Sequence, residues 1–174
     1  YAQSTGRPAF LNLHTPAGLG NAVGNLPNAV ANGAPLVVTA GQQDWRHIVT
    51  DPLLSGDLVG LARPVAKWVH EVRSVDELGT IMRRAFHDAA SAPAGPVFVS
   101  LPMSMLDAEG DLMVPDRSEI ERRVVPAAIE ELAALLTDTP VGSLAIVAGD
   151  EVSASGAVPE LVALAEALGA PVFG

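Results

Sequence analysis

Short apolar runs alternate along the chain with longer stretches that have helical periodicity. The apolar runs predict buried strands at residues 9–14, 35–40, 68–72 and 96–101. Continuous runs of this kind are typical of parallel strands that are covered on both faces. The intervening stretches predict helices at residues 19–31, 57–62 and 74–91. This order of elements predicts an α/β fold built on parallel sheets.

Two of the predicted helices carry end signals in the sequence. Asn32 and Gly33 favour the left-handed backbone conformation that stops a helix. Ser74, followed three residues later by Glu77, has the spacing of a capping box at a helix start. These signals support the expected helix boundaries near residues 31 and 74.

A polar, charged stretch separates these elements from a second set. Pro126 follows that stretch in a position that suits the first turn of a helix. Beyond it the pattern predicts helix 127–136, strand 144–148, helix 158–168 and a strand at 170–173. We therefore predict three-layer parallel sheets with helices on both faces, which belong to parts of two domains. The expected division is residues 1–106, a linker at 107–125, and residues 126–174.

Both ends of the chain are abrupt. The sequence begins at Tyr1 and stops at Gly174, just after a new strand has begun. A complete domain seldom ends at the edge of a new element, so we expect a fragment of a longer protein.

The acidic charge is confined to one part of the chain. There are 20 acidic and 10 basic side chains, a formal net charge of −10, but residues 1–106 hold seven of each. The excess therefore lies in residues 107–174, with thirteen acidic and three basic side chains. This asymmetry supports two structural units. An acidic chain without clustered Lys and Arg is not expected to bind nucleic acid or an anionic membrane.

Two absences from the sequence narrow the chemistry. The sequence has no Cys, which excludes disulfides, thiolate catalysis and Cys-ligated zinc. It has no uninterrupted apolar run of ~18 residues, so no membrane span is expected. A chain without Cys suits a reducing compartment, and we expect a cytoplasmic protein.

The most informative local feature is the segment 14–21, His-Thr-Pro-Ala-Gly-Leu-Gly-Asn. It follows a predicted strand and leads into a helix. In open α/β sheets ligands bind outside the carboxyl ends of strands, where a helix N-terminus adds positive potential. An imidazole at His14 can donate or accept a proton near neutral pH. The alternative is a histidine that only hydrogen-bonds the loop.

Other features of this region have two readings each. Gly18, Gly20 and Gly24 resemble a dinucleotide-binding turn, with Asp44 to meet a ribose, or they let the helix approach the sheet. Residues 39–43, Thr-Ala-Gly-Gln-Gln, either line the same crevice or form a polar turn. Leu53 and Leu54 either form a pocket wall or pin their loop to the core.

Several chemistries have no support in the sequence. His47, His70 and His87 lack the spacing of metal ligands. Neither the G-x-S-x-G motif of serine hydrolases nor the phosphate-binding P-loop motif occurs.

Taken together, these segments resemble the family of thiamine-diphosphate-dependent decarboxylases, in particular those that act on aromatic 2-oxo acids such as benzoylformate. The segments that carry the resemblance are 12–14, 17–21, 27–29, 35–43, 53–54, 63–68 and 95–97. Residues after Pro126, including 146–149 and 164–166, are similar to the start of the family's central domain.

The resemblance implies how the chain relates to a whole enzyme. Residues 1–106 would be the rear part of a pyrimidine-binding domain and residues 126–174 the start of the central domain. The diphosphate-binding domain, and the glutamate that activates the cofactor, would lie outside the chain. The cofactors implied are thiamine diphosphate and Mg²⁺. Active sites in the family form between subunits, which implies a homodimer or homotetramer and an inactive fragment.

The resemblance also implies roles for four residues. His14 would be catalytic and move protons, Gly18 and Asn21 would lie on the cofactor side, and Leu54 would help form the pocket for an aromatic substituent. Thr15 and Pro16 depart from the small residues usual in benzoylformate decarboxylases, which leaves the substrate open. His14 itself differs from the small polar residue usual in acetolactate synthases.

Four functions follow from these readings. The first is non-oxidative decarboxylation of an aromatic 2-oxo acid to an aldehyde and CO₂. The second is another thiamine-diphosphate carboligase or lyase, of the acetolactate synthase or oxalyl-CoA decarboxylase type. The third is a dinucleotide-binding module, and the fourth is a catalytically inactive scaffold homologue.

Overall fold

The computed structural model describes residues 1–116 and 125–174, which belong to two compact units, Tyr1–Ser118 and Glu119–Gly174. The part of the expected linker at 117–124 lies outside the described residues. No helix in the described ranges is long and apolar enough to cross a membrane.

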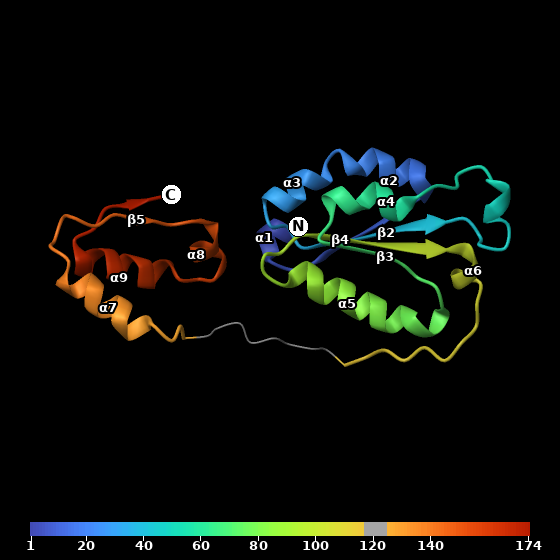
Figure 1. The fold of residues 1–174 in the computed structure, drawn as a ribbon. Coiled ribbons are helices and arrows are strands. Elements are labelled where there is room, and N and C mark those ends of the chain that lie inside the picture. The colour runs from blue at the N-terminus through green and yellow to red at the C-terminus, as the bar shows by residue number, and fades with distance from the viewer. Residues whose placement is uncertain (117–124) are drawn as a thin grey trace. The chain divides into compact units, whose positions relative to one another are not determined.

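The first unit contains a four-stranded parallel sheet (Figure 1). Its strands are β1 (Ala9–Leu13), β2 (Leu36–Gln42), β3 (Trp68–Glu71) and β4 (Pro96–Pro102), in the order β1-β2-β4-β3. The longest pairing joins β2 to β4, from Leu36 opposite Pro96 to Gln42 opposite Pro102. The predicted parallel α/β fold is therefore confirmed.

Helices cover both faces of this sheet (Figure 1). On one face lie α2 (Thr15–Val23), α3 (Leu26–Ala31) and α4 (Leu58–Ala62), and the other face carries α5 (Leu78–Ala90). Because successive side chains of a strand point to opposite faces, each central strand contributes to two cores. The core under α2 to α4 contains Phe98, Leu19 and Leu58, and the core under α5 contains Val37, Val97, Val99 and Ile81. The predicted three-layer arrangement is confirmed.

The strand predicted at residues 9–14 is present as β1, but the prediction that it is buried is wrong. Phe10 is 54% exposed, and Leu11 and Asn12 are also exposed. The reason is that β1 forms one edge of this sheet and pairs only with β2. Phe10 stacks on Phe86 of α5, with 6.3 Å between ring centroids.

The predicted helix at 19–31 is two helices. α2 begins at Thr15, because Pro16 suits the first helical turn. It ends before Gly24, and α3 begins two residues after that glycine, at Leu26. α4 starts as predicted, with the Asp57 carboxylate accepting a hydrogen bond from the Gly60 amide at 2.7 Å.

The predicted capping box is not reciprocal. The Ser74 hydroxyl accepts from the Asp76 amide, and the Glu77 carboxylate accepts from the Arg73 amide. A 3₁₀ turn, Val75–Glu77, precedes α5 as a result.

The remaining elements of the first unit are short. They are α1 (Ala2–Thr5), the 3₁₀ turns Ile48–Thr50 and Arg63–Val65, and α6 (Met103–Leu106). After α6 the chain passes along α5. The Arg83 guanidinium donates to the Pro115 carbonyl at 2.9 and 3.0 Å, and a Cβ on Gly79 would lie 2.1 Å from the Met113 carbonyl oxygen. Glycine is therefore required at position 79 for this close approach.

The second unit has a two-stranded parallel sheet and three helices in its described part. Its elements are α7 (Ile129–Asp138), β5 (Ile146–Val147), α8 (Asp150–Ala154), α9 (Val158–Leu168) and β6 (Val172–Phe173). Gly169 ends α9 in the left-handed conformation. These elements match the predicted helix–strand–helix–strand order, with α8 in addition.

Phe98 tests the core of the first unit. Replacing this fully buried side chain with Ala is expected to lower the free energy of unfolding by about 3–5 kcal/mol, because a cavity remains between the sheet and α4. The matched control is Phe10→Ala at the exposed edge strand, with an expected loss of about 1 kcal/mol. Denaturant titration followed by tryptophan fluorescence measures the effect, since Trp45 and Trp68 are the chain's 2 tryptophans and both lie in this unit. Equal losses for the two variants would contradict the assigned core.

Candidate active site

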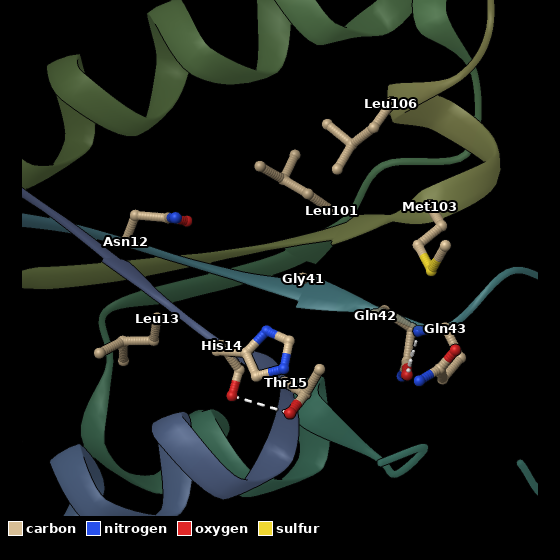
Figure 2. A pocket seen from close by; sticks show the side chains of 10 residues that line it. All are labelled: Asn12, Leu13, His14, Thr15, Gly41, Gln42, Gln43, Leu101, Met103 and Leu106. Carbon is tan, nitrogen blue, oxygen red and sulfur yellow. Dashed lines mark hydrogen bonds between the residues drawn. The ribbon is translucent and has the colours of Figure 1, made fainter. Parts of the chain in front are cut away.

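The carboxyl ends of β1, β2 and β4 surround a cavity of about 280 Å³ (Figure 2). It is lined by Asn12, Leu13, His14, Thr15, Gly41, Gln42, Gln43, Leu101, Met103 and Leu106. This is the edge of a parallel sheet at which ligands of open α/β folds bind. The cavity joins both strand-end motifs that the sequence singled out.

The strand register fixes which residues face each other across the cavity. Leu13 pairs with Ala40 and Gly41 pairs with Leu101, so His14, Gly41 and Leu101 continue one row across three strands. Neighbouring strands lie about 4.8 Å apart, so the backbone at His14 is about 10 Å from that at Leu101. Gly41 lies between them without a side chain, and a Cβ built there would meet nothing within 4 Å.

His14 lies at the junction of β1 and α2. Its side chain is exposed at the cavity, and among the described residues none hydrogen-bonds to the imidazole. The next residue, Thr15, is buried with φ of +54°, a conformation that a β-branched residue rarely adopts. Its hydroxyl donates to the His14 carbonyl at 2.8 Å (Figure 2). The turn therefore holds the backbone of His14 while leaving the ring free to interact with a ligand.

Gln42 and Gln43 attach the loop at 51–57 to the end of β2. The buried Gln42 amide donates to the Gly56 carbonyl at 2.6 Å and accepts from the Gln43 backbone amide at 2.8 Å. The Gln43 side chain donates to the Leu53 carbonyl at 2.9 Å. A Cβ on Gly56 would lie 2.8 Å from the Pro16 ring, so the same loop packs closely against α2. Both glutamines line the cavity, but their NH₂ groups are engaged in holding this loop.

Asn12, two residues before His14 on β1, is a second polar residue that lines the cavity. Its side-chain oxygen accepts from the Thr39 hydroxyl at 2.8 Å. The Asn12 NH₂ group has no hydrogen-bond partner among the described residues. Asn12 and His14 are therefore the side chains best able to bind a polar ligand group here.

The opposite side of the cavity is apolar. Figure 2 shows Leu101, Met103 and Leu106 on one side of the strand ends and His14 with Thr15 on the other. Sequence reasoning missed these three residues. The available signal was their position directly after the predicted strand at 96–101, since the same strand-end rule applies to every strand of the sheet.

Of the four residues to which the resemblance gives roles, one lines the cavity and three lie elsewhere in the first unit. His14 lines the cavity. Gly18 lies in α2 with its amide donating to the His14 carbonyl at 2.8 Å, and Asn21 is exposed further along that helix. Leu54 lies in the loop at 51–57, 38% exposed with φ of +67°, and is not among the cavity-lining residues.

The geometry of a dinucleotide-binding turn is not present. Gly18 and Gly20 lie inside α2 rather than in the loop that joins β1 to the helix. The buried Asp44 carboxylate accepts hydrogen bonds from the Arg46 guanidinium and from the Arg46 backbone amide. These two hydrogen bonds, of which the guanidinium has the larger effect, lower the pKa of Asp44 to about 2. Asp44 is therefore engaged with Arg46 instead of being directed toward a ribose.

The residues present fit a ring-shaped group better than a metal ion. Within residues 1–116 and 125–174, no cluster of three or more His, Asp or Glu side chains is placed to hold a metal. The space above Gly41, bordered by Asn12 and His14, has room for a flat ring with polar edges. The space above Gly41 can therefore accept an aromatic ring of a cofactor or substrate.

Comparison with known proteins connects this geometry to a family. Residues 1–59 match the N-terminal TPP binding domain of thiamine pyrophosphate enzymes. The chain is 40% identical over 103 residues to the benzoylformate decarboxylase of Pseudomonas aeruginosa, a match that covers 59% of this chain and 20% of that protein. It is 38% identical over 102 residues to the mitochondrial acetolactate synthase catalytic subunit of Saccharomyces cerevisiae, covering 59% of this chain and 15% of that protein.

Solved structures match nearly the whole chain. The benzoylformate decarboxylase from Polynucleobacter necessarius superposes with a TM-score of 0.83 at 34% identity, over 98% of this chain and 32% of that one. The thiamine diphosphate-dependent 4-hydroxybenzoylformate decarboxylase of Rhodococcus jostii superposes with a TM-score of 0.82 at 33% identity, over 99% of this chain and 33% of that one.

The chain thus spans about a fifth of the length of the Pseudomonas relative and about a third of these solved chains. The resemblance on which the sequence analysis relied is confirmed by these matches. Residues 1–59 thus match the N-terminal TPP binding domain of thiamine pyrophosphate enzymes, and nearly the whole chain is similar in fold and sequence to thiamine-diphosphate-dependent enzymes.

Proposed function

We propose that the complete protein catalyses the non-oxidative decarboxylation of an aromatic 2-oxo acid, of the benzoylformate type, to an aldehyde and CO₂. The observation that carries this proposal is the pairing of a free imidazole with an apolar wall in one cavity, His14 facing Leu101 and Met103 across the bare Gly41. The similarity to two decarboxylases of aromatic 2-oxo acids supports it.

The cavity has places for the cofactor and for the substrate in this proposal. Bound thiamine diphosphate, with Mg²⁺, would supply the carbon nucleophile and the electron sink that loss of CO₂ requires. The NH₂ group of Asn12 would donate a hydrogen bond to a polar atom on a ring of that cofactor. Gly18 and Asn21, on α2, are proposed to lie on the same side.

His14 is the group proposed to move protons. Its ring is exposed at the cavity, so it can reach the oxygen of a bound 2-oxo acid without first breaking another hydrogen bond. An imidazole in this position can give a proton to that oxygen and take one back as the aldehyde leaves, since a ring nitrogen can either donate or accept a proton. A positioned general acid–base of this kind contributes roughly 10²–10⁴-fold to the rate.

Leu54 is proposed to add to the apolar surroundings of the substrate in the assembled enzyme. Its loop is held by Gln42 and Gln43, which fixes the strained backbone at Leu54. We propose further that the active site forms between subunits of a cytoplasmic homodimer or homotetramer. Residues 1–106 would contribute the pyrimidine-binding side and residues 126–174 the start of a central domain, so that this chain by itself is inactive.

A thermal-shift titration of the complete protein distinguishes the proposal from a dinucleotide-binding module. Thiamine diphosphate with Mg²⁺ is expected to raise Tm, because a ligand at a hundredfold excess over its dissociation constant stabilises the folded state by about 2.7 kcal/mol. NAD is expected to leave Tm unchanged, since Asp44 is engaged with Arg46. A rise with NAD and none with thiamine diphosphate would overturn the assignment.

Substitution of His14 tests its proposed role. His14→Ala in the complete protein is expected to lower kcat by at least roughly tenfold, since the proton-moving group is lost from the cavity. The control is His47→Ala, because His47 is exposed in the loop after β2 and does not line the cavity. Steady-state decarboxylation assays compare the two. Wild-type turnover in the His14 variant, with thiamine diphosphate bound, would exclude the role.

Acetolactate synthesis is the second candidate, because an acetolactate synthase catalytic subunit is 38% identical to this chain over 102 residues. The reaction product separates the two functions. Incubation of the complete protein with pyruvate would give acetolactate for a synthase, whereas an aromatic 2-oxo acid gives an aldehyde and CO₂ for the decarboxylase.

A further inference from the structure

We infer that α6 is a specificity element, in which Met103 and Leu106 join Leu101 to form the wall that receives the apolar substituent of the substrate. The inference rests on the proposed decarboxylase function and adds the residues that select the substrate. It differs from the role given to Leu54, which lies outside the cavity lining.

The separation of polar and apolar groups across the cavity supports this role. His14 belongs to the end of β1, while Leu101, Met103 and Leu106 belong to β4 and α6 and lie on the other side of the strand ends, where Asn12 is also drawn (Figure 2). Gly41 separates the two sides, which lie about 10 Å apart at the backbone. A molecule with an oxo acid at one end and an apolar ring at the other can therefore contact both sides at once.

The wall exposes apolar surface that a substrate can cover. Met103 is 46% and Leu106 is 60% exposed, although both lie at the rim of a concave site. A ring placed against these side chains removes water from both surfaces, which favours binding in proportion to the apolar area covered. A short substituent such as a methyl group leaves most of this apolar surface in contact with water and therefore adds little binding free energy.

α6 follows β4 directly and packs against the core under α5 through Met105, which positions the wall. At the end of β4 Pro102 pairs with Gln42, and the single turn of α6 closes with the Asp107 amide donating to the Met103 carbonyl at 3.0 Å. The chain after α6 is attached to α5 by Arg83 and passes over Gly79 at close range. A wall fixed in this way can discriminate between substituents by shape.

The test compares five single variants of the complete protein, of which Leu54→Gln changes the loop at 51–57. Met103→Gln and Leu106→Gln make the wall polar at nearly the same size. Met113→Gln and Leu112→Gln are the matched controls, because both residues are exposed in the segment after α6 and neither lines the cavity. Measured with thiamine diphosphate and Mg²⁺, kcat/KM is determined for phenyl-substituted and methyl-substituted 2-oxo acids.

The wall variants are expected to lower kcat/KM for the phenyl substrate by about tenfold, with the methyl substrate changed less than about twofold, because only the ring reaches the wall. The controls are expected to leave both values unchanged. A binding measurement that needs no turnover accompanies the assay. Calorimetric titration with a phenyl-bearing 2-hydroxy acid is expected to show an about tenfold weaker Kd for Met103→Gln than for Met113→Gln.

The outcomes test the specificity role of α6 separately from the proposed decarboxylase function. If wild-type protein decarboxylates aromatic 2-oxo acids but the wall variants keep the wild-type ratio of phenyl to methyl substrate, the specificity role of α6 is wrong and the function stands. If Leu54→Gln alone changes that ratio, the selecting wall is the loop at 51–57, and the inference is likewise overturned. If no 2-oxo acid is decarboxylated, the proposed function fails, and the titration alone decides whether α6 binds the ring.

Discussion

The parallel pairing of β2 with β4 is the contact on which the rest of the first unit depends. Val37, Val38, Val97, Phe98 and Val99 are fully buried along this pair, and they supply side chains to the cores on both faces. The same register brings Gly41 beside Leu101 and, through β1, places His14 at the next position of the row. A slip of one residue would turn these side chains to the opposite faces and dismantle both cores, so the register that stabilises the fold also defines the cavity.

The central part of the fold could be predicted because its burial is a local property of the sequence. β2 and β4 are covered on both faces, so their apolar runs are continuous and visible along the chain. β1 is correctly predicted as a strand but wrongly predicted to be buried, because an edge position depends on which strands pair beside it. The split between α2 and α3 at Gly24 and the short α6 were missed, since single turns leave little periodicity to detect.

The candidate site could be predicted only on the side that local rules describe. His14 follows a predicted strand and precedes a helix, and this position alone places it at the ligand-binding edge of the sheet. Met103 and Leu106 follow β4, and they reach the same cavity only because β4 inserts between β2 and β3. That strand order is set by long-range packing. For Gln42 and Gln43 the sequence leaves open whether they line the crevice or form a polar turn. They line the cavity, and their role in holding the loop that carries Leu54 depends on three-dimensional contacts.

We propose that an aromatic 2-oxo acid binds in the cavity at the ends of β1, β2 and β4. A crystal structure of the complete protein with thiamine diphosphate, Mg²⁺ and a phosphonate analogue of such an acid, which cannot lose CO₂, would show directly where the acid binds. We expect the analogue's ring to lie against Met103 and Leu106 and its oxo oxygen to lie within hydrogen-bond distance of His14. An analogue bound away from this cavity, with His14 making no contact to it, would show that the substrate binds elsewhere.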